Sequence, residues 1–394
     1  MEEYLMGKLC KGSWVFGVFV VISSFLFIYP SFAGQSVIST AVPANHTYNS
    51  RSPAIVFIDD IIGYSFYAAD NGNCYVRKTQ NGGTIWEEPV DLNGSLSSCT
   101  GPVVWYDQWT PGDNSGDMIY VVFADEQTDE MYLQILDTSI GSLVHVPEPV
   151  AITNISATHG MQDISQYAIS KSTTDVLYVG LNDNDGSMVL SCPYNLDPAN
   201  CDSVSEFTNI GVGLLDDVKQ DEVKLMPLDS GDMLLIRRDY SQNDVDSKVY
   251  HVGSMNWDSQ WTDIDTSASA STGFRNAISA VVNKTTHDVY MCYTEKPNAS
   301  GAVIHTAIFS GGSWTHKANV ITEDKSQQCQ ISYDETTGDI YVSRIEQDTT
   351  ANFREISLHV SSDGMNSWQD LQRISETRDD FRTLAMNPHA DKNI

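Results

Sequence analysis

Three arginines stand at the start of short apolar segments in similar local sequences. Arg51 lies in SRSPAI, Arg275 in FRNAIS and Arg382 in FRTLAM. A guanidinium binds a carboxylate through two parallel hydrogen bonds, so arginines gathered around one opening would hold an anionic ligand. The alternative is that each arginine pairs with an aspartate of a neighbouring repeat. Arg237 and Arg238 form a further basic pair, of which a strand directs only one inward.

Asp70 is the candidate for proton transfer. General acid catalysis needs a carboxyl group with a raised pKa within reach of the reacting atom. The sequence Asn-Gly-Asn follows Asp70 and is typical of a hairpin turn, in which the aspartate only shapes the backbone. Both interpretations stay open at this point.

The metal-binding signal is confined to one segment. Residues 182–186 read NDNDG and offer oxygen ligands at alternate positions, as in half of a calcium loop. The segment lacks the distal glutamate, so a solvated turn is the alternative. No cysteines have the CxxC spacing of a zinc site, and no H-x-x-x-H pair occurs. We therefore expect no metal and no cofactor, apart from calcium at this segment.

Composition limits the class of protein. The 394 residues carry 52 acidic and 22 basic side chains, a formal net charge of -30. Nucleic-acid binding needs clustered Lys and Arg, and no such cluster is visible. Apolar residues at 41% and aromatic residues at 10% exclude a disordered acidic tail. The composition therefore indicates an acidic, folded protein with a sizeable core.

The amino-terminal segment has the layout of a secretory signal peptide. Lys8 and Lys11 precede an uncharged apolar run at 15–29, and Ala33 offers a cleavage site after small residues. A membrane span needs about 20 residues, so the run is short. An uncleaved anchor at the cell surface is the alternative. We expect a secreted protein whose mature chain has no membrane span unless this segment is retained.

Six cysteines follow residue 33, and an oxidising compartment allows them to pair. We favour the sequential set Cys74–Cys99, Cys192–Cys201 and Cys292–Cys329, with buried free thiols as the alternative. Five N-x-[ST] sequons fit a secreted, loop-rich surface; they begin at Asn45, Asn93, Asn154, Asn283 and Asn298.

A strand pattern recurs every 51 to 58 residues along the chain. Its six copies read GYSFYA, MIYVVF, VLYVGL, MLLIRR, DVYMCY and DIYVSR. A polar turn usually precedes each copy, and another apolar strand precedes the turn. A constant period with room for about four strands is typical of a β-propeller. We therefore predict an all-β, six-bladed propeller of four-stranded blades.

A second marker recurs in the same phase. Its copies, TQNGGTIW, SMNWDSQW, AIFSGGSW and SSDGMNSW, end at Trp86, Trp261, Trp314 and Trp368. The marker resembles the Asp-box (BNR) motif, S/T-x-D/N-x-G-x-x-W, of sialidase-like propellers. The first copy, with Asn81, Gly83 and Trp86, is a full match, whereas the last keeps Asp363 and Trp368 but has Met365 at the glycine position. The resemblance implies a tight outer turn, away from the ligand-binding face.

The resemblance to sialidases is strongest in the first repeat. There Arg51 falls on the first arginine of the family's carboxylate-binding triad, and Asp70 lies in the loop of its acid/base aspartate. Sialidases also need a tyrosine nucleophile activated by a glutamate, because the sialic acid carboxylate repels a carboxylate nucleophile. The glutamate position falls on Pro227, and the second arginine falls near Val249, beside Lys248. Half of the constellation is missing, which argues against sialidase catalysis.

The expected organisation has four parts: 1–33, a signal peptide or anchor; 34–50, an extension; 51–376, the propeller; and 377–394, a further repeat or tail. Residues 36–42 are a candidate closing strand. A truncated fragment of a larger ring, with more than six blades, is the other reading.

The sequence leaves three hypotheses for the function. The first hypothesis is a secreted, non-catalytic propeller that binds an extracellular glycan or protein on its loop-rich face. The alternative is an exo-sialidase-type glycoside hydrolase with a divergent site, so enzymatic activity stays open. A third possibility is a structural surface-layer or adhesin component. The predicted ligand-binding residues are Arg51, Arg237 and Arg275, with Asp70 catalytic only in a sialidase.

Overall fold

The computed structural model describes most of the chain beyond residue 53. The described ranges are 54–96, 98–125, 127–128, 130–153, 166–182, 188–195, 200–211, 222–239, 244–265, 278–295, 303–320, 326–348, 353–373 and 386–389. The expected signal peptide, the extension 34–50 and the candidate closing strand lie outside these ranges.

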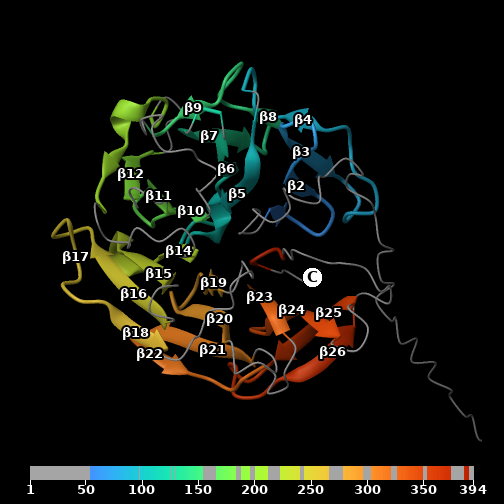
Figure 1. The fold of residues 1–394 in the computed structure, drawn as a ribbon, viewed down its shortest axis with the longest axis vertical. Helices are drawn as coiled ribbons and strands as arrows, with labels where there is room; N and C mark the ends of the chain where they lie inside the picture. Colours follow the sequence, from blue (N-terminus) through green and yellow to red (C-terminus); the bar gives the residue numbers. More distant parts are fainter. Residues whose placement is uncertain are drawn as a thin grey trace, which may run out of the picture.

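Six antiparallel sheets stand in a ring around a common axis (Figure 1). Blade 1 contains β1 (Ile55–Phe57), β2 (Gly63–Ala68), β3 (Cys74–Thr79) and β4 (Val90–Asp91). Blade 2 contains β5 (Thr100–Tyr106), β6 (Met118–Asp125), β7 (Glu130–Asp137), β8 (Ser142–Leu143) and β9 (Val150–Ala151). Blade 3 contains β10 (Gln166–Lys171), β11 (Val176–Asn182), β12 (Met188–Pro193) and β13 (Thr208–Asn209).

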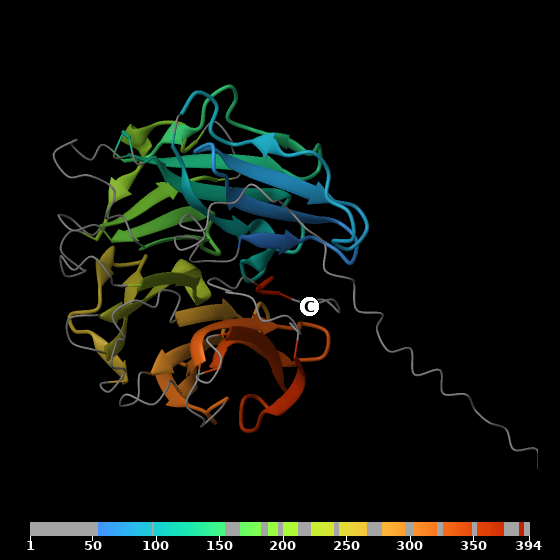
Figure 2. The same ribbon diagram turned by 45° about the vertical axis from the view of Figure 1, so that its right-hand side comes forward.

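The second half of the ring repeats the arrangement (Figure 2). Blade 4 contains β14 (Glu222–Pro227), β15 (Met233–Asp239), β16 (Asp244–His251), β17 (Asn256–Trp257) and β18 (Thr262–Asp265). Blade 5 contains β19 (Ile278–Val282), β20 (Val289–Glu295), β21 (Val303–Ser310) and β22 (Ser313–His316). Blade 6 contains β23 (Ser326–Tyr333), β24 (Ile340–Asp348), β25 (Phe353–Ser361) and β26 (Gln369–Arg373).

The strands of each blade pair in chain order, from the innermost outward. β9 and β18 are additional partners of β7 and β16. Three 3-10 turns, η2 (Asp107–Trp109), η4 (Val204–Glu206) and η5 (Asp229–Gly231), are the only helical elements of the described residues, and none is long and apolar enough to cross a membrane. The prediction of an all-β propeller with six four-stranded blades is confirmed.

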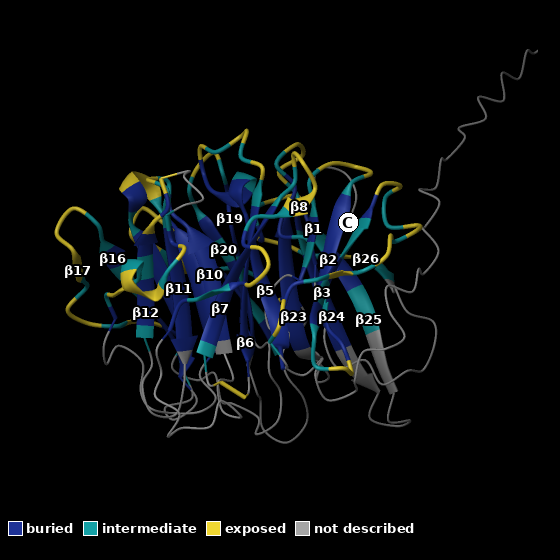
Figure 3. Ribbon diagram, turned by 90° about the horizontal axis from the view of Figure 1, so that it is seen from above, coloured by how far each residue is buried: buried dark blue, intermediate teal, exposed yellow. Residues whose placement is uncertain are grey.

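The recurring strand of the sequence is the second strand of each blade. Its residues are apolar on both faces because each sheet packs between two neighbouring sheets. Every residue of β15 is buried, as are all residues of β6 after Met118 (Figure 3). The polar turns before these strands close through side chains: Asn283 Oδ1 accepts the amides of Thr285 and Thr286 at 2.8 and 3.0 Å.

The three predicted disulfides are all present. Cys74–Cys99 ties β3 to the segment before β5, and Cys292–Cys329 ties β20 to β23. Each therefore links a terminal blade to its inner neighbour. Cys192–Cys201 closes a shorter loop within the third repeat. The two inter-blade bonds restrict separation of the first and last blades from their neighbours.

The turns formed by the second marker are closed by the side chains at its Asn or Asp position. Asn81 Oδ1 accepts the amide of Ile85 at 2.8 Å, and Asp363 Oδ1 accepts the amide of Ser367 at 2.9 Å. Hydrogen bonds from Ser367 and Ser361 hold the pKa of Asp363 at about 2. Gly83 has a φ of 83°, and Met365 adopts a φ of 65° at the same place.

Indole groups near these turns link adjacent blades. Trp314 Nε1 donates to Ser247 Oγ at 2.8 Å, and Trp368 Nε1 donates to the carbonyl of Ala318 at 2.9 Å. In both cases the acceptor belongs to the preceding blade. The marker tryptophans therefore contribute inter-blade hydrogen bonds as well as buried apolar surface.

Two of the five sequons contradict the expectation of a surface position. Asn93 and Asn283 are 0% and 4% exposed. The side-chain amide of Asn283 donates to the hydroxyls of Tyr290 and Tyr333 at 3.3 and 3.0 Å, and Asn93 Oδ1 accepts the amide of Cys74. A glycan on either side chain would displace these bonds. The other three sequons lie outside the described residues.

Candidate functional site

The alternation of strand direction gives the ring two distinct faces. Turns between first and second strands and between third and fourth strands lie on one face, which carries the marker turns and is called the box face here. Connections between second and third strands, and from one blade to the next, lie on the opposite face, called the connection face.

A groove of about 470 Å³ opens between blades 4 and 5, at strand ends that lead to the connection face. We call it the blade 4–5 groove. It is lined mainly by polar side chains, namely Asp263, Ile264, Asp265, Tyr293, His305, His316, Lys317 and Asn319. The lining combines hydrogen-bond acceptors, donors and aromatic rings.

Strand β18 supplies the acidic wall of the groove through its sequence TDID. The pairing of β18 with β16 shifts register here: Asp263 lies opposite Asp246 and Asp265 lies opposite Val245, so Ile264 is the extra residue of a β-bulge. Ile264 is 4% exposed and anchors the strand in the core, whereas Asp263 is exposed and Asp265 is half-buried. Asp263 and Asp265 both line the groove, so β18 contributes two carboxylates to it.

Tyr293 lies at the bottom of the groove and connects blade 5 to blade 4 through a hydrogen bond. It is fully buried, and its hydroxyl donates to Asp265 Oδ2 at 2.9 Å. The Nδ1 atom of His316 lies 3.5 Å from the same hydroxyl. His305, the register partner of Tyr293 on β21, stacks on its ring with a centroid separation of 5.2 Å and an interplanar angle of 16°. The groove therefore has a rigid Tyr–His surface beside its carboxylates.

Arg237, a predicted ligand-binding residue, is held by acidic partners in blade 4. Its guanidinium lies 3.1 Å from Asp239 and 2.9 Å from Asp246, and its Nε donates to Asp246 at 3.0 Å. The ring of Trp261 stacks on it at 3.9 Å. Arg237 is 3% exposed, so its guanidinium pairs with carboxylates inside the blade instead of facing solvent.

Three carboxylates beside this arginine have the spacing of a metal site. Oxygens of Asp239, Asp244 and Asp246 lie within 4.8 Å of one another. Burial, followed by the charges of Asp246 and Asp239, raises the pKa of Asp244 to about 6. Arg237 neutralises part of their charge, whereas Oδ1 of Asp244 and Oδ1 of Asp246 accept no hydrogen bond within the described part of the chain. Residues 183–186 of the predicted calcium segment lie outside the described residues.

Of the other predicted site residues, Asp70 is described and does not line this groove. Asp70 is exposed in the hairpin turn between β2 and β3, where Ala69 N bonds to Asn73 O at 2.8 Å. Pro227 ends the innermost strand of blade 4. Arg51 and Arg275 lie outside the described residues.

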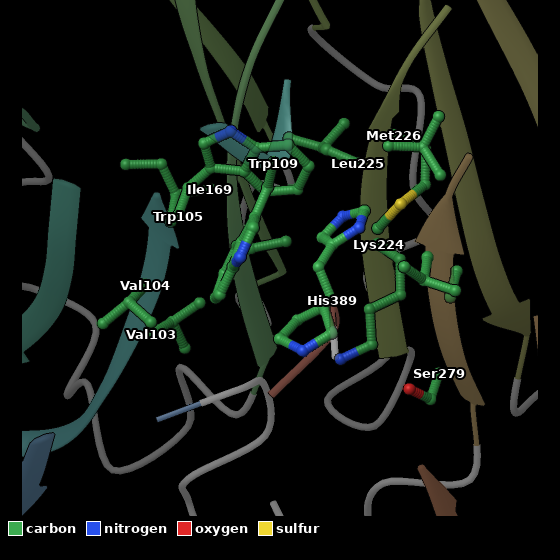
Figure 4. Close-up of a pocket in the computed structure, with 15 residues that line it drawn as sticks. Val103, Val104, Trp105, Trp109, Ile169, Lys224, Leu225, Met226, Ser279 and His389 are labelled. Atoms are coloured by element: carbon green, nitrogen blue, oxygen red, sulfur yellow. The ribbon is translucent and has the colours of Figure 1, made fainter. Parts of the chain in front are cut away.

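A pocket in the central channel is lined by the innermost strands of blades 2 to 5 and by Pro388 and His389 (Figure 4). Its free volume is about 30 Å³, enough for a single water. Pro388 accepts the amide of Tyr333 at 2.9 Å, and His389 forms a parallel bridge with Tyr333. The His389 ring packs 6.2 Å from Trp109 and lies 3.3 Å from a Glu335 oxygen. Residues 386–389 therefore form a plug that spans the channel from blade 6 to blade 2.

A second hollow of about 400 Å³ lies on the box face around Lys171. The Lys171 ammonium is fully buried and lies 2.6, 2.8 and 3.3 Å from carboxylates of Asp107, Asp113 and Asp175. Burial disfavours its charged form, but the carboxylates of Asp107 and Asp113 outweigh burial and raise the pKa of Lys171. The three donors of the ammonium are thus occupied, and the network joins blades 2 and 3.

Sequence reasoning did not single out the groove residues. The segment TDID at 262–265 reads like any half-buried strand. Asp265 and Tyr293 come from different repeats, and only the packing of blade 4 on blade 5 brings them together. The histidines were dismissed for lacking metal-ligand spacing, which does not test for a hydrogen-bonding or stacking role.

Comparisons with known proteins give the fold. No family profile matches the sequence, and a search of curated proteins found no match. Among solved structures, a PL25 ulvan lyase, a polysaccharide lyase, is similar with a TM-score of 0.52 and 9% identity over 86% of this chain and 84% of the lyase.

Two further similar structures are glycoside hydrolases. The NanB sialidase of Streptococcus pneumoniae has a TM-score of 0.46 and 12% identity over 80% of this chain and 68% of the sialidase. The α-L-arabinofuranosidase Arb93A of Fusarium graminearum has a TM-score of 0.47 and 8% identity over 82% and 95%. The six-bladed β-propeller of the structure is the fold that the sequence predicted, and sialidases are among the structures similar to it.

Proposed function

We propose that this protein is a secreted propeller that binds glycans in the blade 4–5 groove without cleaving them. The observation that carries the proposal is the lining of that groove. Each sugar hydroxyl both donates and accepts hydrogen bonds, and carboxylates, an amide and imidazoles offer the matching partners. Asp263, Asp265, His316 and Asn319 supply these groups around one cavity.

A non-catalytic role is supported by the state of the chemically capable groups. Arg237 is paired with two buried carboxylates, and the Tyr293 hydroxyl is buried and donates to Asp265. Neither group is placed to clamp or attack a sugar. Three disulfides favour an oxidising compartment, which supports secretion.

A glycan array probed with the purified protein tests this proposal. Neutral, amino, uronic and sialylated oligosaccharides should be compared, because the polysaccharide lyase with the same fold makes glycans the first ligands to try. We expect retention of at least one class, weakened several-fold by Asp265→Asn or His316→Ala. The matched control is Asp60→Asn, an exposed aspartate of the turn between β1 and β2, which should bind as the wild type does.

The sialidase alternative is tested in parallel with 4-methylumbelliferyl sialoside. We expect no release of the fluorophore. Steady turnover of the sialoside that Asp70→Ala abolishes would contradict the proposal and support the hydrolase alternative. An array on which no glycan is retained, or on which the groove variants bind like wild type, would also reject it.

A further inference from the structure

We infer that His251 is a pH-dependent clamp that holds two turns of blade 4 together on the box face while its imidazole is protonated. One turn joins β14 to β15, and the other joins β16 to β17. The blade 4–5 groove opens at strand ends that lead to the opposite face. The clamp therefore goes beyond the proposed glycan binding and does not depend on it.

His251 is the last residue of β16 and lies between two carboxylates from different parts of the blade. Its Nδ1 lies 2.9 Å from Asp232 Oδ2, and its Nε2 lies 3.0 Å from Asp258 Oδ1. Asp232 stands immediately before β15, the second strand, whereas Asp258 follows β17, the fourth strand. One imidazole ring thus bridges the turn between the first two strands and the outer corner of the blade.

Each of these carboxylates uses its other oxygen to accept a backbone amide. Asp232 Oδ1 accepts the amide of Val252 at 3.0 Å, and Asp258 Oδ2 accepts the amide of Val249 at 3.1 Å. The two amides stand on either side of His251 in the chain. The imidazole therefore fixes two carboxylates that in turn hold the backbone around it.

Blade 4 carries a degenerate copy of the second marker, SMNWDSQW. In blades 1 and 6 the Asn or Asp of the marker accepts a backbone amide of its turn. In blade 4 Asn256 stands at that position and accepts the hydroxyl of Ser254 at 2.8 Å. The aspartates bridged by His251 accept backbone amides at this corner, so in blade 4 a histidine contributes to closing the turn.

The bridge needs both ring nitrogens to donate. A neutral imidazole has one N–H and one lone pair, so in that state one of the two contacts would bring a lone pair against a carboxylate oxygen. Hydrogen bonding to Asp232, and then to Asp258, raises the pKa of His251 above its ordinary value of 6.5, and burial opposes this only in part. The side chain is 43% exposed, so the ring can exchange protons with solvent in the folded protein.

The other titratable groups near the clamp do not change charge in the same range. Tyr250 precedes His251, and Tyr178 of blade 3 packs on its ring at 6.2 Å. Burial raises the pKa of both phenols, and for Tyr178 the charges of Tyr250 and Asp232 add to burial. Both phenols therefore stay neutral while His251 titrates.

The direction of the pH effect follows from the raised pKa of the histidine. The folded protein holds the proton of His251 more tightly than the unfolded chain does. The stabilisation from the clamp is therefore complete below the unfolded value of about 6.5 and is lost as pH rises through the folded value. Above that value, the two turns should separate more readily.

Amide hydrogen exchange from about pH 5.5 to about pH 8.5, corrected for the intrinsic effect of pH on exchange, tests the clamp. We expect the protection of peptides covering 245–258 to fall several-fold over this range, with a smaller change in the equivalent strands of blade 6. A nuclear magnetic resonance titration of the His251 ring should give a pKa above 6.5, which Asp258→Asn should lower.

The variant His251→Gln keeps a polar side chain but cannot gain a proton. We expect its protection at 245–258 to be low at every pH, like that of the wild type at high pH. The matched control is His287→Gln, because His287 lies in a turn on the same face and contacts one carboxylate, that of Asp229, at 3.5 Å. It should keep the response of the wild type.

Two results would overturn the clamp. One is a His251 pKa at or below 6.5 in the wild type, which needs no variant to fold. The other is a loss of protection with pH in His251→Gln that equals the loss in the wild type. Neither result bears on glycan binding, which the groove variants test separately.

Discussion

The hydroxyl of Tyr293 in blade 5 donates a hydrogen bond to Asp265 Oδ2 in blade 4 at 2.9 Å. The tyrosine is fully buried and the aspartate lines an open groove. One bond thus connects the packing between two blades to the orientation of a ligand-facing carboxylate. A preorganised carboxylate loses less entropy on binding than a mobile one.

Removing this hydroxyl should weaken both stability and binding. We expect Tyr293→Phe to cost about 1–2 kcal/mol in the free energy of unfolding, because the variant removes one buried hydrogen bond and little packing volume. Binding of a retained glycan should weaken several-fold through the freed Asp265 side chain. Urea denaturation and calorimetry measure the two effects. Unchanged glycan affinity in a destabilised variant would show that the bond does not position the carboxylate.

The channel plug should matter for stability alone. His389 is 6% exposed, packs on Trp109 and contacts Glu335. We expect His389→Ala to destabilise the protein by about 2 kcal/mol, mainly through lost packing against Trp109. Glycan affinity should stay at the wild-type value because the plug is not part of the groove lining. His316 is exposed, so His316→Ala is the reverse control. It should weaken glycan binding and leave the stability near that of the wild type.

Met365 sets two effects against each other. Its φ of 65° is a conformation that glycine adopts freely, and relief of this strain is worth about 1 kcal/mol. Its side chain is fully buried in a core cluster, and emptying such a site costs about 2–5 kcal/mol. We therefore expect Met365→Gly to be destabilising. Once the slightly larger cavity of the glycine variant is subtracted, its loss of stability should be smaller than that of Met365→Ala, because only glycine relieves the backbone strain. Thermal unfolding of both variants decides this, and a stabilised glycine variant would contradict it.

The raised pKa of Asp244 makes a prediction about pH. Its folded-state pKa is about 6, above the usual value of 3.8, so the folded protein binds more protons than the unfolded chain between these values. This group's contribution to stability therefore falls as pH rises through that window, and above pH 6 it is destabilising. We expect Asp244→Asn to gain stability over the wild type as pH rises from 4 to 7. Urea denaturation with a chelator present measures the difference, and a constant offset would contradict it.

The ring was predictable from the sequence because its information is local and repeated. The period of the second strand, the marker turns and the even number of cysteines each report on a single repeat or on neighbouring ones. All three disulfides follow chain order for the same reason. Met365 shows the limit, since a departure from the glycine of the turn left the turn itself intact.

The groove was not predictable because it depends on packing between repeats. Nothing local to Asp265 or Tyr293 indicates that they meet, and Arg237 looked available for a ligand until its acidic partners were seen. The buried sequons at Asn93 and Asn283 show the same limit, because motif recognition does not report burial. Contacts across blades follow from blade twist and spacing, which a repeat pattern does not encode.

The location of the ligand is the most direct test of the account. Amide hydrogen exchange should be measured with and without a glycan that the protein retains. We predict slower exchange in 262–265 and 303–320, the strands that line the blade 4–5 groove, with the box face unchanged. Protection confined to the box face or to blades 1–3, with none at β18, β21 or β22, would contradict the assignment of this groove as the binding site.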